Sequence, residues 1–227
     1  MTFGHLASGT DGVWSERAEA YRTSATHMQG DDLEALVQMC EPSEGVKALD
    51  VASGGGHVAR RLREAGCSVV TVDPAPGMRA DVLARAEDLP FADGAFDVVV
   101  TRIAAHHFSD IARAVAELER VSNRLVVVED TLYLSEQQEQ AEKLRDPTHV
   151  RSYTEGEWKE MLTAVGLEVE QVEHFEKVHA MHEWLARTDC EGEEAERVKE
   201  LLAPVSTPDG KAWRDVKILL KARKSQV

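Results

Sequence analysis

Apolar positions along the chain fall into short runs that alternate with amphipathic stretches. Six runs have the length and composition of β-strands: Lys47–Val51, Ser68–Val72, Phe96–Thr101, Arg124–Glu129, Leu167–His174 and Asp215–Ala222. The first four are almost continuously apolar, which is typical of parallel strands covered on both faces. In the fifth, apolar and charged residues alternate, which predicts a half-exposed strand nearer an edge of the sheet.

Helical patterns lie between these runs. The predicted helices are Asp31–Met39, Val58–Ala65, Ile111–Val121, Glu155–Val165, Val178–Arg187 and Glu193–Leu202. Thr154 and Glu157 have the spacing of a capping box, and Gly166 is a suitable stop for the helix that they open. Alternating strands and helices predict an α/β fold, with an open parallel sheet covered by helices on both faces.

The connection after the first strand carries the strongest indication of a ligand site. Residues 47–57 read Lys-Ala-Leu-Asp-Val-Ala-Ser-Gly-Gly-Gly-His. Three glycines leave the turn without side chains, so a nucleotide-like ligand can touch backbone and a helix N-terminus. Asp50 would repel a phosphate there but attract an ammonium or sulfonium group. Asp73, at the end of the second strand, can accept hydrogen bonds from both ribose hydroxyls.

The same residues leave other interpretations open. Gly54, Gly56 and Ala59 also satisfy the dinucleotide pattern G-x-G-x-x-G/A, so a nicotinamide-dependent oxidoreductase is one alternative. A tight turn beside a solvated aspartate is the simplest structural explanation. Asp50 and the lack of a Tyr-x-x-x-Lys pair count against the oxidoreductase.

Composition narrows the class of protein. A length of 227 residues with 43% hydrophobic and 30% charged residues suits one globular α/β domain. No apolar run approaches the roughly 20 residues needed to span a bilayer, so we expect no membrane insertion. Three widely spaced cysteines favour a reduced, cytoplasmic protein. A net charge of −15 argues against nucleic-acid partners and favours small-molecule chemistry.

Further motifs follow the glycine turn. They are Ala86-Glu-Asp-Leu-Pro-Phe91, the turn Asp93-Gly94, the strand from Phe96 and the segment Arg102-Ile-Ala-Ala-His-His-Phe108. In combination with Asp50 and the glycines, they closely resemble the class I S-adenosylmethionine-dependent methyltransferases. The nearest resemblance is to the small-molecule type 11 group, which includes ubiquinone- and menaquinone-biosynthesis-like enzymes. It covers nearly the whole chain, from Ala18–Ser24 through Arg145–His149 to the last strand.

This resemblance implies an architecture and an activity. It implies a single methyltransferase domain over residues 1–227, with residues 1–40 and 176–205 as helical cap segments. The Rossmann-like sheet would have seven strands, or one fewer at a shortened edge, and an antiparallel last strand. The cofactor would be S-adenosylmethionine, the product S-adenosylhomocysteine, and the acceptor a small, partly apolar metabolite. An enzyme that uses the same cofactor for rearrangement or cyclisation, and a non-catalytic ligand-binding protein, remain alternatives.

The resemblance also assigns cofactor-binding roles by position. The matched residues are Tyr21, Asp50, Ala52, Ser53, Gly54, Gly56, Asp73, Met78, Ala86, Glu87 and Arg102. Those from Asp50 to Gly56 would surround the methionine part of the cofactor, and Asp73 would bind the ribose. Met78, Ala86 and Glu87 would border the adenine, Arg102 would end a strand beneath the cofactor, and Tyr21 would close over it. Met78 and Tyr21 could instead simply fill gaps in the core.

One segment departs from the family pattern. Only 13 steps separate Asp73 from Ala86, where relatives usually fit a full helix and another strand. Residues 76–85 have room for one turn and a short strand. Arg85 stands where many relatives place an acid that bonds the adenine amine. We therefore expect a compact sheet edge and an adenine pocket that is more open or completed by other residues.

Histidines are the candidate general bases. His106 and His107 follow the strand that would face the cofactor, and His149 belongs to a polar segment expected to wrap over the site. An imidazole titrates in the range that suits proton abstraction, but each could equally be a packed structural residue. His179 and His182 are expected on a cap helix. His106 and His107 are adjacent and would point in different directions, and the pair His179 and His182 lacks a nearby third ligand, so we predict no metal site.

Charged residues near these histidines also have two interpretations. Arg145 and Arg151 could bind an acidic acceptor or pair with the abundant carboxylates. Asp31 and Asp32 are expected to be charges at a helix N-terminus or on the surface.

Overall fold

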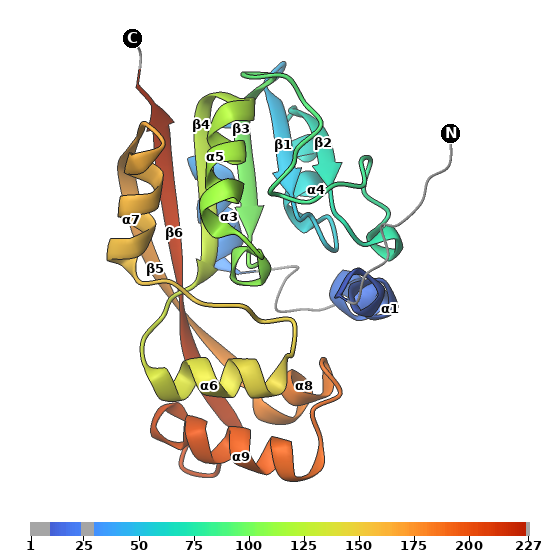
Figure 1. The fold of residues 1–227 in the computed structure, drawn as a ribbon, viewed down its shortest axis with the longest axis vertical. Helices are drawn as coiled ribbons and strands as arrows, with labels where there is room; N and C mark the ends of the chain where they lie inside the picture. Colours follow the sequence, from blue (N-terminus) through green and yellow to red (C-terminus); the bar gives the residue numbers. More distant parts are fainter. Residues whose placement is uncertain (1–9, 24–29, 226–227) are drawn as a thin grey trace.

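The computed structural model describes residues 10–23 and 30–225, and its centre is a six-stranded sheet of order β2-β1-β3-β4-β6-β5 (Figure 1). The strands are β1 (Lys47–Val51), β2 (Ser68–Val72), β3 (Phe96–Arg102), β4 (Ser122–Thr131), β5 (Leu167–Ala180) and β6 (Ala212–Lys224). The first four are parallel, whereas β6 runs antiparallel to both β4 and β5. The predicted Rossmann-like sheet with an antiparallel last strand is confirmed.

The edge beyond β2 is as short as the sequence predicts. Pro76–Met78 form one 3₁₀ turn, η1, and Val82 makes an isolated parallel bridge to Val72. Two backbone hydrogen bonds hold that bridge, one from Asp73 to Val82 and one from Val82 to Thr71. A single bridge thus stands where a further strand would extend the sheet, and six strands remain in the described ranges.

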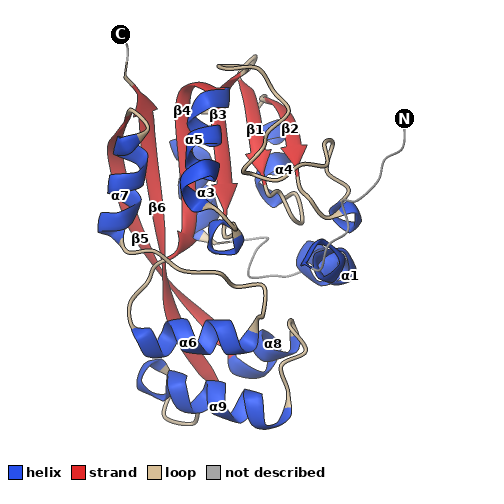
Figure 2. Cartoon of the chain, in the orientation of Figure 1, coloured by secondary structure: helices blue, strands red, loops and turns tan. Residues whose placement is uncertain are grey.

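Helices cover both faces of the sheet (Figure 2). They are α1 (Thr10–Thr23), α3 (Asp31–Met39), α4 (His57–Glu64), α5 (Ile111–Val121), α6 (Glu136–Arg145), α7 (Glu155–Ala164), α8 (Met181–Ala186) and α9 (Gly192–Leu202). Buried side chains of α5 and α7 pack on one face, against Leu49 and Val99 among others. Those of α3 and α4 pack on the other, against Ala48 and Val98. This division follows from the alternation of side chains along each strand.

The start of α7 is capped as predicted. The Thr154 hydroxyl accepts a hydrogen bond from the Glu157 amide, and the Glu157 carboxylate accepts one from the Thr154 amide. Both otherwise unpaired donors of the first helical turn are thereby satisfied.

Strands β5 and β6 continue past the rest of the sheet as a long two-stranded ribbon, on which α6, α8 and α9 pack (Figure 1). The predicted helix from Val178 is therefore wrong at its start, because residues up to Ala180 pair with β6 and the helix begins at Met181. Helix α6 was not predicted, because its sequence is almost entirely polar. Its Ser135 cap, which accepts a hydrogen bond from the Gln138 amide, was the available signal.

The described helices include none that is both long and apolar enough to cross a lipid bilayer.

Candidate functional site

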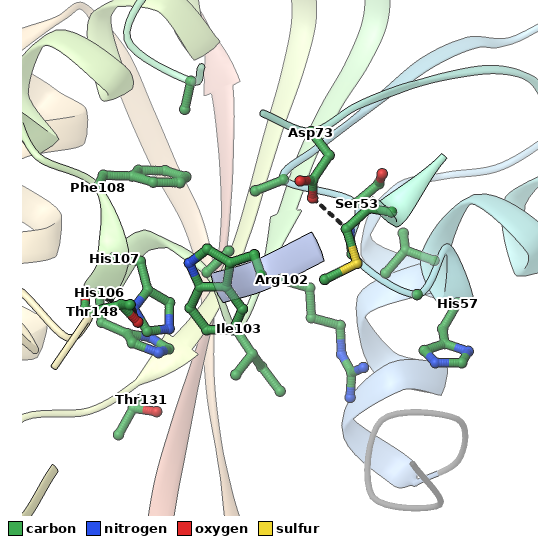
Figure 3. Close-up of a pocket in the computed structure, with 18 of the residues that line it drawn as sticks. Ser53, His57, Asp73, Arg102, Ile103, His106, His107, Phe108, Thr131 and Thr148 are labelled. Atoms are coloured by element: carbon green, nitrogen blue, oxygen red, sulfur yellow. Dashed lines mark hydrogen bonds between the residues drawn. The ribbon is translucent and has the colours of Figure 1, made fainter. Parts of the chain in front are cut away.

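A cavity opens at the carboxyl ends of the parallel strands and extends towards α6 and α8. Figure 3 shows Asp73 and Ser53 on one side of it and His106, His107 and Thr131 on the other, with Arg102 and Ile103 between them. We call the first side the glycine-turn end and the second the histidine end. Ligands of open α/β sheets bind at this edge.

The glycine turn leaves the cavity wall bare at its centre. The Ser53 amide donates to the Val72 carbonyl at 3.0 Å, and the Gly54 amide donates to the Asp73 carboxylate at 3.0 Å. Gly54 has a φ of 49°, and a Cβ added to it would meet no atom within 4 Å. A ligand can therefore approach the backbone here. Gly56, with a φ of 73°, instead caps the N-terminus of α4.

Asp73 is buried at the end of β2, and both of its oxygens are held by backbone. One accepts from the Gly54 amide, and the other accepts from the Ala75 amide at 2.9 Å. These two bonds fix the carboxylate at the cavity wall. A carboxylate oxygen can accept more than one hydrogen bond, so this arrangement suits recognition of ligand hydroxyls.

Asp50 is also buried and lines the same end of the cavity. Its carboxylate accepts a hydrogen bond from the Ala59 amide at 3.0 Å. Burial raises the pKa of Asp50 to about 7, an effect that this bond only partly offsets. A cation in the cavity would favour the charged form, because an opposite charge nearby lowers the pKa of an acid.

The wall beyond Asp73 combines local and distant residues. Met78 in η1 packs with Ala18 and Ala75, and Trp14 of α1 contacts this cluster and lines the cavity. Glu87 accepts hydrogen bonds from the amide and the hydroxyl of Ser109, both at 2.8 Å. The short segment after Asp73 is thus completed by the N-terminal helix and by the loop around Phe108, which also lines the cavity.

Arg102 lies at the end of β3 within a buried ionic network. Its guanidinium contacts Asp32 at 2.5 Å and Glu129 at 2.7 Å, and Lys177 contacts Asp32 at 2.6 Å. Burial would raise the pKa of Asp32, but these partners outweigh it and lower the pKa to about 2. Asp31 and Asp32 lie in the first turn of α3, as predicted, but Asp32 is buried rather than on the surface, because it connects α3 to β3 and β5 beneath the cavity.

His106 forms a pair with a buried aspartate. Its Nδ1 lies 2.5 Å from Asp130 Oδ1, and its amide donates to Asp130 Oδ2 at 2.7 Å. Burial raises the pKa of Asp130, but the positive charge and the hydrogen bond of His106 outweigh it and leave that pKa below its usual value. When the neutral ring donates its Nδ1–H to the ionised Asp130, its Nε2 carries the lone pair that can accept a proton.

The other two candidate bases differ from His106 in their contacts. His107 Nδ1 lies 3.0 Å from the Thr148 carbonyl, and burial together with the charge of His106 holds the pKa of His107 well below its usual value. His149 Nε2 lies 3.2 Å from both oxygens of Glu139, and His149 does not line the cavity. Within the described ranges, no three His, Cys, Asp or Glu side chains gather in a metal-binding arrangement.

The histidine end continues into a polar cluster between β4, β5 and β6. Lys217 Nζ donates to Asp215 at 2.6 Å and to the Thr131 hydroxyl at 2.7 Å. His179 Nε2 lies 3.1 Å from Asp215. The prediction that His179 lies on a helix is wrong, because His179 belongs to β5 and pairs with Trp213 of β6. Arg145 lies over the ring of Trp184, 4.1 Å from its centroid.

Comparison with known proteins identifies the family. A methyltransferase-domain model matches residues 49–124. YcgJ of Bacillus subtilis, an uncharacterized methyltransferase, is 30% identical over 211 residues, which cover 83% of this chain and 82% of that protein. The chain belongs to the class I S-adenosylmethionine-dependent methyltransferases.

Two further comparisons place this methyltransferase among its relatives. A solved structure from Bacillus halodurans C-125 has a TM-score of 0.77 at 28% identity, covering 87% of this chain and 100% of that one. The demethylmenaquinone methyltransferase of Thermus thermophilus is 38% identical over 102 residues, which cover 37% of this chain and 46% of that enzyme. The expected family, fold and enzyme class are confirmed.

The methyltransferase gathers most of the predicted site residues around one cavity. Those that line it are Asp50, Ala52, Ser53, Gly54, Asp73, Met78, Ala86, Glu87, Arg102, His106 and His107. Gly56 and His149 lie outside the lining, and the side chain of Tyr21 lies outside the described residues. Sequence reasoning missed the lining residues Trp14, Thr131, Lys217 and Asp215, as well as Asp130 behind His106. Asp130 and Thr131 end β4, whereas Asp215 and Lys217 lie within β6, and none of the four carries a local motif.

Proposed function

We propose that this protein transfers the methyl group of S-adenosylmethionine to a small, partly apolar acceptor by in-line displacement. The observation that carries the proposal is the pairing of two unlike ends in one cavity. Two buried carboxylates flank a turn without side chains at one end, and a histidine–aspartate pair lies at the other.

The glycine-turn end fits the cofactor. Asp73 would accept hydrogen bonds from the ribose hydroxyls, and Asp50 would face the ammonium of the methionine part. The open space over Gly54 would admit that part of the molecule, where any larger side chain would intrude. Met78, Ala86 and Glu87 would border the adenine, with Trp14 closing a pocket that the short segment after Asp73 leaves open.

S-adenosylmethionine supplies a methyl carbon made electrophilic by its sulfonium. The protein's own contribution is to align the acceptor with that carbon and to keep water out, which can provide much of the acceleration. His106 Nε2 would take the proton from an acceptor hydroxyl or amine. Asp130 would keep the ring oriented and stabilise the charge that develops on it, a positioning role like that of other aspartates behind catalytic histidines.

The two other histidines are less suited to this step. The lowered pKa of His107 makes its ring a weak proton acceptor, and its 4.6 Å edge contact with Trp14 fits a wall residue. His149 supports His106 from behind, at 5.2 Å between ring centroids. We therefore assign the general base to His106.

The acceptor would lie between α1 and α8. Trp14, Phe108 and Trp184 give this part of the cavity apolar walls, and Ile103 lies at its floor. Trp14 belongs to the proposed cap segment 1–40, and Trp184 to the segment 176–205. These segments would thus shape the acceptor pocket, although residues 176–180 belong to strand β5.

Calorimetry and product mass test the proposal. We expect S-adenosylhomocysteine to bind with micromolar affinity and NAD to bind far more weakly. With S-adenosylmethionine and an acceptor library, mass spectrometry should detect S-adenosylhomocysteine together with an acceptor heavier by one methylene unit. An isomerised product without methyl loss would favour rearrangement or cyclisation, and no binding at millimolar ligand would contradict the proposed function.

A further inference from the structure

We propose that the far part of the histidine end, formed by Lys217, Arg145 and their neighbours, binds a carboxylate group of the methyl acceptor. We call it the carboxylate subsite. The proposal rests on the proposed function, because it identifies the substrate class of the same cavity. It is carried by the buried Lys217 and the largely buried Arg145, which line the cavity and have hydrogen-bond donors that the described residues do not take up.

Lys217 is the inner cation of the subsite. It is 5% exposed and lines the cavity from β6. Its ammonium has three donors, of which Asp215 and the Thr131 hydroxyl take two. The third can be given to a ligand. A buried ammonium with an unused donor favours an anionic partner, because desolvation is offset only by pairing and hydrogen bonding.

Arg145 is the second cation. Its side chain is 10% exposed and lies over Trp184, which fixes the plane of the guanidinium. Its nearest carboxylates, Glu142 at 4.0 Å and Asp146 at 3.6 Å, lie beyond hydrogen-bond distance, and its buried Nε has no hydrogen-bond partner in the described part of the chain. A guanidinium held this way offers the planar fork that matches a carboxylate.

The two cations of this subsite, Lys217 and Arg145, can only donate hydrogen bonds. His179 Nε2 lies 3.1 Å from Asp215 Oδ1, and the other acceptors nearby are the Glu142 carboxylate and Asp146 Oδ2, which has no hydrogen-bond partner within the described residues. The ligand group should therefore accept hydrogen bonds. Asp215 and Glu142 would repel a phosphate dianion more strongly than a monoanion, which favours a carboxylate.

The subsite is connected to the proposed base through adjacent residues. Lys217 bonds Thr131, and Thr131 follows Asp130, which bonds His106. The Thr131 amide also donates to Asp130 at 2.8 Å. An acceptor anchored by its carboxylate at Lys217 and Arg145 could place a nucleophilic oxygen or nitrogen beside His106. We therefore infer that the acceptor is a small hydroxy- or amino-carboxylic acid.

Binding of matched probes tests this inference. The probes are 4-hydroxybenzoate and 3-hydroxybutyrate, each compared with its neutral amide, titrated by calorimetry or ligand-observed NMR into protein saturated with S-adenosylhomocysteine. We expect each carboxylate to bind at least about tenfold more tightly than its amide. Lys217→Met and Arg145→Met should each weaken the carboxylate about 10- to 100-fold, the effect of losing a charged hydrogen bond.

Arg151→Met is the matched control. Arg151 belongs to the same segment as Arg145 but is exposed and pairs with Glu157, so its loss should leave carboxylate binding unchanged. Because Lys217→Met leaves Asp215 without its cation, the melting temperature of each variant is measured first, and Arg145→Met keeps the test valid if Lys217→Met fails to fold.

Three results would overturn the inference: no binding of either carboxylate, equal binding of carboxylate and amide, or unchanged binding in both variants. A separate measurement, the binding of S-adenosylhomocysteine to the wild-type protein, shows whether the proposed function itself fails. If S-adenosylhomocysteine does not bind the wild-type protein, the cofactor assignment fails, and the probe titrations repeated without it still decide whether the carboxylate subsite exists.

Discussion

The two ends of the cavity are built in different ways. At the glycine-turn end, the turn and Asp50 lie within eight consecutive residues and Asp73 follows the next strand, although Trp14 of α1 completes the wall. At the histidine end, His106, Lys217 and Arg145 come from a loop, a strand and a helix that are far apart in sequence. The centre of the glycine-turn end can thus be encoded locally in the sequence, whereas the histidine end is assembled only by folding.

The two ends also differ in charge. Asp50 and Asp73 make the glycine-turn end negative, which suits a cationic amino-acid part and a ribose. The other end carries the cations Lys217 and Arg145 next to the carboxylates Asp215 and Glu142, in a protein whose net charge is −15. Cationic donors at the histidine end and carboxylate acceptors at the glycine-turn end would orient two different ligands within one cavity, with the methyl group between them.

Replacement of the base should have the largest effect. We expect His106→Gln to lower kcat about 100- to 10,000-fold with any acceptor that the enzyme methylates, because general-base catalysis contributes that much. Affinity for S-adenosylhomocysteine should stay within about twofold. His182→Gln, on the exposed side of α8, is the matched control. A normal kcat in His106→Gln would show that His106 is not the general base.

Blocking the turn should affect only the glycine-turn end. We expect Gly54→Val to weaken S-adenosylhomocysteine binding at least about 100-fold, because the new side chain enters the ligand space and the backbone has a positive φ. Gly45→Val imposes a similar backbone cost at an exposed turn outside the cavity and should bind normally. Calorimetry measures the affinity of both variants, and normal binding in Gly54→Val would contradict the proposed position of the cofactor over this turn.

Loss of the ribose acid should have an intermediate effect. We expect Asp73→Ala to weaken S-adenosylhomocysteine binding by about 1–3 kcal/mol, the usual cost of losing buried hydrogen bonds. Asp81→Ala is the control: Asp81 also bonds backbone beside β2, at the Thr71 amide, but does not line the cavity. Unchanged affinity in Asp73→Ala would exclude this carboxylate from cofactor recognition.

The sequence predicted most of the sheet because parallel strands in an α/β fold are marked by continuous apolar runs. The bounds of β1 and β2 agree with the predicted ones to the residue. It failed where structure depends on distant pairing: β5 extends to Ala180 only because β6 lies beside it, and polar α6 is held by packing around Ala141. The same limit explains the missed site residues. Asp130 and Lys217 acquire a role only when His106 and Thr131 are brought to them.

The smallest predicted effect is a pH dependence that belongs to the glycine-turn end alone. Burial raises the pKa of Asp50 from its usual value near 4 to about 7, so between these values the folded protein binds a proton that the unfolded chain releases. The free energy of unfolding contributed by Asp50 therefore falls as pH rises from about 4 to 7 and is constant above. The ligand ammonium needs the ionised form, so affinity for S-adenosylhomocysteine should rise across pH 6 to 8 by at most about tenfold per pH unit and then level off.

Two variants assign that pH dependence to one carboxylate. Asp50→Asn should bind S-adenosylhomocysteine weakly and with little change across the same range. Glu129→Gln should keep the wild-type slope, even though burial also raises the pKa of Glu129 to about 7, because Glu129 pairs with Arg102 and does not line the cavity. Calorimetry at several pH values measures all three proteins. If the pH dependence of affinity persists in Asp50→Asn but disappears in Glu129→Gln, the titrating group is Glu129 in the ionic network. The ionisation of Asp50 would then not control ligand binding at the glycine-turn end.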